Sequence, residues 1–305
     1  MRVKLARTVI KTLPPASRLL AAVVASVVVV TGIVLTMSIS AAGTPIAFEA
    51  ESGSLANGAV TTATTGASGG SAVKFAAAST PTPSPTPTDM VPLGVPGTWT
   101  LKFDDEFNGT SLDLTKWSNC WFSPTCGSMN NVTTNPANVA VSGGNLILTL
   151  ASASSGALIS TDPTGGATTG YQFTTGFTEA RVYFPGNGTT IYNWPAWWAN
   201  GNNWPSAGEH DIAEGLGDMT VNYHSPSGSH NQGTIPGIWS NAFHTYGLHR
   251  MAGRADVYYD GVLVKSYTTD DNGAPNYLIL NVGAGNQAVY GTGSQLKVDY
   301  VRAWQ

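Results

Sequence analysis

The feature that most restricts the fold of this chain is a series of short β-branched and aromatic runs separated by glycine, asparagine and proline. Such runs are typical of strands, and no helical apolar period of useful length accompanies them. The segments 256–259 and 262–267 flank Asp260-Gly261, a pair favoured in two-residue hairpin turns. About a dozen strands of this kind predict an all-β sandwich of two curved antiparallel sheets. The clearest runs are NLILTL (145–150), FTEARVYF (177–184), NYLILNV (276–282) and QLKVDYVRA (295–303).

The N-terminus carries an uncharged apolar run from Leu19 to Met37, preceded by five basic residues and followed by small residues. The run is about as long as a bilayer core is thick, and its basic flank predicts that the rest of the chain is exported. We therefore interpret residues 1–42 as a signal peptide, with an uncleaved signal anchor as the alternative. Either way the protein is expected to be extracellular, secreted or attached to the cell surface.

The segment 79–94 is predicted to be a linker, because STPTPSPTPT at 79–88 alternates proline with hydroxyl residues and favours an extended spacer. It separates residues 43–78 from a large domain at 95–305. The shorter segment resembles the opening of carbohydrate-binding modules that begin F-E-A-E. It is too short to bury much apolar surface, so we expect a remnant that does not fold independently.

Charge and cysteine content narrow the functional classes. Without the five basic residues of the N-terminal segment, the rest of the chain has nine basic and 18 acidic residues. This acidic balance argues against a nucleic-acid partner and is compatible with a neutral glycan; we expect a monomer. The two cysteines, Cys120 and Cys126, lie in the exported part, so a disulfide bond is predicted, with two unpaired thiols as the alternative.

The sharpest motif is GEHDIAE at residues 208–214. On a strand, Glu209 and Asp211 share one face and His210 points to the other. Glu214 is five residues from Glu209, so a regular strand would turn it away from the other two acids. One bulged residue near Ile212 or Ala213 would return it to the same face.

With such a bulge, the two glutamates would lie about as far apart as the 5–5.5 Å typical of retaining glycosidases. Like charges also raise the pKa of one member, which allows one carboxyl to act as an acid while another is ionised. A calcium site and a solvated acidic strand are the alternatives for this motif.

Aromatic residues precede the acids: NWPAWW occupies 193–198 and Trp204 lies five residues before Glu209. Indole faces stack on the apolar faces of pyranose rings. Trp194, Trp198 and Trp204 are therefore predicted to bind substrate.

Residues 95–305 resemble glycoside hydrolase family 16, the laminarinase and lichenase family. The resemblance implies a β-jelly roll with an open cleft, in which Glu209 is the nucleophile, Asp211 the assisting aspartate and Glu214 the acid/base. The longer form of the motif is similar to the laminarinase-like branch, which implies β-1,3 or mixed β-1,3-1,4 glucan as substrate. Its motifs are FDDEFNG (103–109), GNL (144–146), EARVYFP (179–185), WPAWW (194–198), GEHDIAEG (208–215), FHTYGLH (243–249), YLILNVGAG (277–285) and VDYVRAWQ (298–305).

The resemblance also implies further residues at the cleft, namely His224, His244 and Asn281. It implies a structural calcium ion with Glu106 and Asp299 as ligands, and no cofactor for catalysis. His210 departs from the family pattern, because an aliphatic residue is usual there. We expect the imidazole to face the core, where it needs a polar partner.

The leading hypothesis from the sequence is an endo-acting, retaining β-glucanase. Three alternatives are a non-catalytic glycan-binding protein, a cell-wall transglycosylase and a galactan hydrolase on the same fold.

Overall fold

A computed structural model describes residues 60–74, 90–120, 126–163 and 169–305. The predicted signal or anchor segment and the proline-threonine run of the linker lie outside these residues. The chain divides into two units, Met1–Ser84 and Pro85–Gln305. No helix within the described residues is long and apolar enough to cross a membrane.

The first unit contains one described hairpin. Strand β1 (Val60–Ala63) pairs antiparallel with β2 (Ser71–Lys74), and a 3-10 turn, η2 (Ser68–Gly70), precedes β2. All four residues of β1 are exposed. The hairpin by itself thus provides no hydrophobic core, and independent folding of this segment stays an open prediction.

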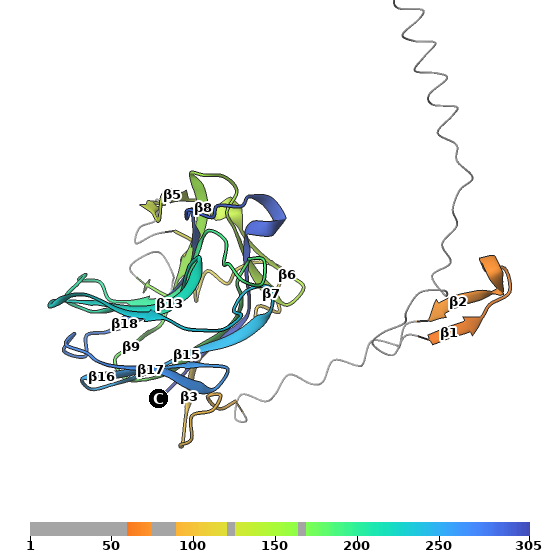
Figure 1. Ribbon diagram of the computed structural model, residues 1–305. Helices are drawn as coiled ribbons and strands as arrows, with labels where there is room; N and C mark the ends of the chain where they lie inside the picture. The colour runs from red at the N-terminus through yellow and green to blue at the C-terminus, as the bar shows by residue number, and fades with distance from the viewer. Residues whose placement is uncertain (1–59, 75–89, 121–125, 164–168) are drawn as a thin grey trace, which may run out of the picture. The chain divides into compact units, whose positions relative to one another are not determined.

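The second unit is a sandwich of two sheets, which confirms the predicted fold class (Figure 1). The first sheet has the order β17-β16-β15-β10-β19-β7-β6, with β3 also paired to β19. Every pair in it is antiparallel. Its strands are β3 (Leu101–Asp105), β6 (Val139–Ser142), β7 (Asn145–Thr149), β10 (Gly176–Tyr183), β15 (Phe243–Met251), β16 (Arg254–Tyr259), β17 (Val262–Thr268) and β19 (Gln295–Trp304).

The second sheet has the order β14-β13-β12-β11-β18-β8-β5-β4, with β9 paired to β18. One pair, β5 with β8, is parallel. Its strands are β4 (Ser128–Met129), β5 (Val132–Thr134), β8 (Ser155–Ser160), β9 (Gln172–Phe173), β11 (Trp194–Asn200), β12 (Glu209–Leu216), β13 (Asp218–Ser225), β14 (Gly228–Thr234) and β18 (Asn276–Gly283). The described part of this unit also contains the 3-10 turns η4 (Pro136–Asn138) and η6 (Gly291–Ser294).

The core lies between the two sheets and contains side chains from both. Trp197 and Leu280 of the second sheet join Tyr246 and Leu248 of the first in one buried cluster. The predicted turn at Asp260-Gly261 connects β16 to β17, and both residues have positive φ, 48° and 76°. This is the backbone that a tight two-residue hairpin turn requires.

The second unit begins earlier than predicted. Met90 and Val95 are buried against Trp304 and Phe177, and the Trp304 indole N–H donates to the Met90 carbonyl at 2.9 Å. Residues 90–94 therefore belong to the domain and not to the linker. Local composition could not predict this boundary, because the burial of Met90 depends on contact with Trp304 in the C-terminal strand.

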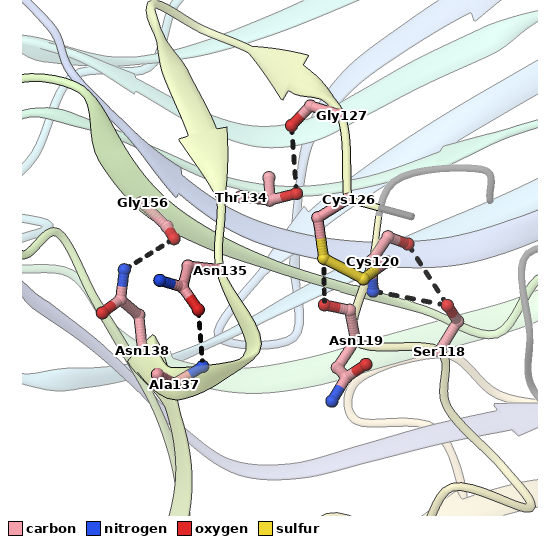
Figure 2. The surroundings of a disulfide bond; sticks show 10 residues. All are labelled: Ser118, Asn119, Cys120, Cys126, Gly127, Thr134, Asn135, Ala137, Asn138 and Gly156. Atoms are coloured by element: carbon pink, nitrogen blue, oxygen red, sulfur yellow. Dashed lines mark hydrogen bonds between the residues drawn. A yellow bond between two sulfur atoms is a disulfide. The ribbon is translucent and has the colours of Figure 1, made fainter. Parts of the chain in front are cut away.

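The disulfide bond between Cys120 and Cys126 is present (Figure 2). It lies near β5, where the Thr134 hydroxyl donates to the carbonyl of Gly127 at 3.2 Å. The bond joins the two sides of the segment 121–125, which lies outside the described residues.

Candidate active site

The site is built on β12, and the predicted bulge in this strand is present. Opposite β11, Ala213 pairs with Trp197 and Asp211 with Trp198, so Ile212 has no partner. Opposite β13, the register also shifts between Asp211 and Glu214. One extra residue therefore lies in β12, and Ile212 and Ala213 are both fully buried while Glu214 is partly exposed. The bulge brings Glu214 back to the face that carries Glu209.

Strand β13 supplies the polar neighbours of these acids. Its residues alternate, so Val221 and Tyr223 enter the core while Asn222 and His224 share the face of the carboxylates. His224 lies directly opposite Glu209, and Asn222 lies opposite Asp211. The strand period of two thus places an amide and an imidazole beside the acids.

At the Glu209 end, one imidazole lies between two carboxylates. His224 Nε2 is 3.5 Å from Glu209 Oε1 and 3.3 Å from Asp211 Oδ2. Its other nitrogen, Nδ1, makes a 2.8 Å hydrogen bond with the Ser229 hydroxyl of β14. The Trp204 side chain also hydrogen-bonds Glu209. Glu209 therefore has two polar partners that stabilise its ionised form.

Burial dominates the titration of this end. It raises the pKa of Glu209 to about 8, the charge of Asp211 raises it further, and His224 opposes the rise. Burial and the Glu214 charge hold the pKa of Asp211 well above its usual value. Asp211 is the more buried acid, so its ionised form is strongly disfavoured. Trp204 and His224 lower the pKa of Glu209 against this effect of burial, so ionisation is opposed less there.

At the Glu214 end, two side-chain N–H groups fix the carboxylate. The Trp194 indole donates to Oε1 at 2.6 Å, and the Asn222 amide donates to Oε2 at 2.6 Å. Trp194 also lines a cavity of about 500 Å³. The cavity is lined by Asn131, Thr190, Asn193, Trp194, Leu216, Gly217, Asp218, Gly285, Asn286 and Gln287.

The predicted substrate-binding residues divide into two groups. Trp204 is 57% exposed, and Trp194 and His224 are partly exposed, so all three can contact a ligand. Trp198 and Asn281 are buried at 6% and 0% exposure, which contradicts their predicted role.

Trp198 and Asn281 instead form hydrogen bonds beneath Trp194. The Trp198 indole donates to Asn281 Oδ1 at 2.8 Å, and the Asn281 amide donates to the Trp194 carbonyl at 3.2 Å. Asn222 was missing from the sequence prediction. Its position two residues before His224 on the same strand was the signal that could have found it.

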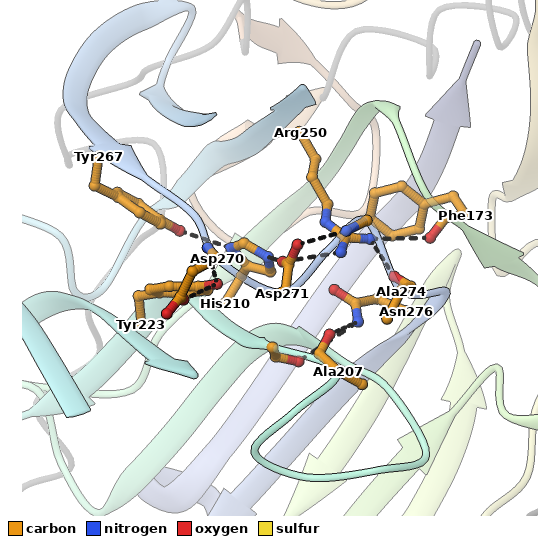
Figure 3. A network of polar contacts seen from close by, with 12 residues as sticks. Phe173, Ala207, His210, Tyr223, Arg250, Tyr267, Asp270, Asp271, Ala274 and Asn276 are labelled. Atoms are coloured by element: carbon orange, nitrogen blue, oxygen red, sulfur yellow. Dashed lines mark hydrogen bonds and ion pairs between the residues drawn. The ribbon is translucent and has the colours of Figure 1, made fainter. Parts of the chain in front are cut away.

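His210 lies on the core side of β12, as expected, and has polar partners (Figure 3). Its Nδ1 is 2.9 Å from the Tyr267 hydroxyl, and its Nε2 is 3.2 Å from Asp271 Oδ2. Arg250 pairs with the same Asp271 carboxylate at 2.9 Å. Burial lowers the pKa of His210, so the imidazole is neutral at pH 7 while Asp271 and Arg250 form the ion pair.

His244 does not reach the cleft. It lies on β15 in the first sheet, where Nδ1 contacts Asp260 Oδ2 at 2.7 Å. The three acids lie on β12 in the second sheet, so the structure does not place His244 beside them.

The predicted calcium ligands do not fit a calcium site. Both oxygens of Glu106 accept hydrogen bonds from Arg302, at 2.7 and 2.9 Å. Asp299 pairs with Arg181 at 2.6 Å. A guanidinium thus neutralises each carboxylate that was expected to bind the ion, and we assign no metal to this pair.

One group of described residues could hold a metal ion: Glu209, Asp211 and His224, whose ligand atoms lie within 4.8 Å of one another. This group contains the same side chains that would act on a substrate. A metal ion bound there would occupy the reactive face of Glu209.

Comparison with known proteins agrees with this geometry. A family model described as "XgeA-like, catalytic GH16 domain" matches residues 184–235, which include the bulged strand. No curated protein matches the chain significantly.

Several solved structures are similar. SCLam, a non-specific endo-β-1,3(4)-glucanase from family GH16, is 26% identical over 70% of this chain and 94% of its own, with a TM-score of 0.57. LamAcat from Zobellia galactanivorans is 26% identical over 68% of this chain and 98% of its own, with a TM-score of 0.53. The laminarinase from Flavobacterium sp. UMI-01 shares the fold at 23% identity over 68% of this chain and all of its own, with a TM-score of 0.54.

The sandwich, the bulged strand with its acids on one face, and these matches lead to one conclusion: the chain is similar to the catalytic domains of glycoside hydrolase family 16.

Proposed function

We propose that this protein is an endo-acting, retaining β-glucanase that cleaves β-1,3 or mixed β-1,3-1,4 linkages. The bulge at Ile212 carries this proposal, because it places Glu209, Asp211 and Glu214 on one face of β12. A double displacement needs two carboxyl groups that reach the same glycosidic bond.

In the first step, the Glu209 carboxylate attacks the anomeric carbon of the sugar. The bond from that carbon to the leaving oxygen breaks as Glu214 delivers its proton to the oxygen. In the second step, Glu214 takes a proton from water, the water oxygen attacks the same carbon, and Glu209 is released.

Asp211 and His224 control the charge of the nucleophile. A proton on Asp211 relieves its repulsion with Glu209, while His224 Nε2 lies beside both carboxylates. Glu209 can then ionise in a site whose burial disfavours negative charge.

The surroundings favour a neutral sugar chain. Trp204 and Trp194 flank the two glutamates, and aromatic faces suit pyranose rings. The cavity beside Trp194 has one charged lining side chain, Asp218. A carboxylate there would repel sulfated or acidic sugars. SCLam, which acts on β-1,3(4)-glucan, supports the same substrate class.

We also propose that the protein acts outside the cell. The apolar N-terminal run with its basic flank and the Cys120–Cys126 disulfide support this location.

The decisive experiment incubates the purified protein with laminarin, lichenan, xyloglucan, agarose and carrageenan, and sizes the products. We expect a ladder of short oligosaccharides from laminarin or lichenan, with the β-anomer formed first in proton NMR. Glu209→Gln should abolish cleavage, while Asp299→Asn, which removes a carboxylate from the other sheet, should retain it. Initial release of the α-anomer, or turnover by Glu209→Gln, would reject the proposed mechanism.

A further inference from the structure

The bulge that aligns the two glutamates leaves one backbone position outside the sheet pairing. Ile212 has no register partner on β11 or on β13. A bulged residue falls out of the ladder, yet a buried carbonyl still needs a hydrogen-bond donor. Ile212 is fully buried, so surface water cannot donate a hydrogen bond to its carbonyl.

Tyr259 supplies the donor from the opposite sheet. Its hydroxyl donates to the Ile212 carbonyl at 2.9 Å, and its ring is 1% exposed. Tyr259 is the last residue of β16, and Ile212 lies in β12. The hydrogen bond therefore crosses the core and attaches the first sheet to the bulged residue of the catalytic strand.

The ring of Tyr259 is itself held in place. Tyr246 packs against it at a centroid distance of 4.7 Å and an interplanar angle of 84°, and Trp239 packs at 5.0 Å and 79°. Edge-to-face packing of this kind orients aromatic rings. The Tyr259 hydroxyl consequently has little freedom to leave the carbonyl.

His210 attaches the same strand two residues earlier. Its imidazole contacts Tyr267 and Asp271 (Figure 3). Tyr267 lies on β17, next to β16 in the first sheet. The first sheet thus makes two polar contacts with β12. Tyr267 contacts His210, next to Glu209, and Tyr259 contacts the bulged residue Ile212.

We propose that Tyr259 is a positioning residue for catalysis: its hydrogen bond to the Ile212 carbonyl fixes the bulge, and with it the placement of Glu214 relative to Glu209. This inference rests on the proposed function, because the placement matters only if both glutamates act on one glycosidic bond. Small displacements of catalytic groups reduce rates strongly while leaving remote binding contacts intact.

The test compares Tyr259→Phe with Tyr246→Phe. Each variant loses one buried hydroxyl from facing positions of the β15–β16 pair, and each hydroxyl donates to a carbonyl, since Tyr246 bonds Trp239 O at 3.4 Å. Only Tyr259 contacts the bulge. We expect Tyr259→Phe to lower kcat on laminarin or lichenan by about 10- to 100-fold, with KM within about twofold.

The pH profile separates positioning from general stability. Displacement of Glu214 changes the mutual repulsion of the carboxylates, so the limbs of the kcat/KM profile should move in Tyr259→Phe. They should stay in place in Tyr246→Phe. Circular dichroism and thermal unfolding establish that both variants are folded at the assay temperature.

Hydrogen exchange in residues 209–216 provides a measurement that is independent of activity. Exchange should accelerate in Tyr259→Phe and not in Tyr246→Phe. Unchanged exchange together with wild-type kcat, or equal losses in the two variants, would overturn the role of Tyr259. A wild-type protein inactive on every glucan would instead reject the proposed function, and the exchange comparison would still decide whether Tyr259 holds the bulge.

Discussion

The two ends of the acidic motif on β12 place chemically identical glutamates in different surroundings. Glu209 shares its end with a second carboxyl group, Asp211, and an imidazole, His224. Glu214 accepts hydrogen bonds from two neutral donors, Trp194 and Asn222. An end that can exchange a proton internally suits a nucleophile, whereas an end fixed by neutral donors suits a group that must face the leaving oxygen.

The largest expected effect tests the assignment of roles directly. Glu209→Ala and Glu214→Ala should each lower kcat by about 10³-fold or more. Azide added with an activated aryl β-glucoside substrate should then react differently. In Glu209→Ala it replaces the nucleophile and gives an α-glycosyl azide, whereas in Glu214→Ala it attacks the glycosyl-enzyme and gives a β-glycosyl azide. Proton NMR of the products distinguishes them, and exchanged stereochemistry would reverse the two roles.

A second prediction concerns the imidazole of the Glu209 end. His224 lowers the pKa of Glu209, so His224→Gln should raise that pKa. The acidic limb of kcat/KM, which requires ionised Glu209, should move to higher pH, with kcat about 10-fold lower. Asn222→Ala is the matched variant at the Glu214 end and should lower kcat without moving the acidic limb. A common shift in both variants would remove the distinction between the ends.

The raised pKa of Glu209 also predicts a cost in stability. This carboxyl binds its proton more tightly in the folded state than in the unfolded state. Proton binding therefore stabilises the fold fully below the ordinary pKa of 4.5, and this stabilisation is lost as the pH rises toward about 8. Glu209→Gln cannot ionise, so it should unfold at a higher temperature than wild type near pH 8, by a few kcal/mol at most in the free energy of unfolding. Near pH 4 the difference should be small.

Thermal unfolding at several pH values checks this prediction. Asp113 offers a control of opposite sign, because hydrogen bonds from Thr115 lower its pKa. Relative to wild type, Asp113→Asn should become less stable as the pH rises, whereas Glu209→Gln should become more stable. A gain for Glu209→Gln that is equal at all pH values would contradict the electrostatic explanation.

The smallest expected effect concerns the exposed indole beside Glu209. Trp204 is 57% exposed, so Trp204→Ala should leave the unfolding temperature nearly unchanged. It should raise KM for glucan by about 3- to 10-fold, the amount expected from one lost stacking contact. Leu263→Ala, which truncates a 48% exposed side chain on the first sheet, should change neither quantity. An unchanged KM in Trp204→Ala would exclude this ring from the binding surface.

Local periodicity predicted much of the site. The spacing of Glu209, Asp211 and Glu214 required an extra residue near Ile212 or Ala213 if all three were to share a face, and the register has that residue. The inward direction of His210 followed from the same alternation. These inferences worked because direction along a strand depends on near neighbours in the sequence.

The burial of individual side chains could not be predicted from local periodicity. Trp194, Trp198 and Trp204 are equivalent as sequence letters, but Trp198 is buried against Asn281 of β18. Which aromatic residues are covered depends on strands that are distant in the sequence. The partners of the two predicted calcium ligands were hidden for a similar reason, because Arg302 and Arg181 reach Glu106 and Asp299 through strand pairing with β19.

The amino-acid sequence alone determined the strand-rich fold, the acidic motif and the side of the strand on which each acid lies, because these follow from side-chain chemistry and a period of two. The tertiary structure decided which partners reach those acids: His224 and Asn222 from β13, Trp194 from β11, and the Tyr259 hydroxyl from the opposite sheet. Such contacts join residues far apart in the chain, and only packing brings them within hydrogen-bond distance.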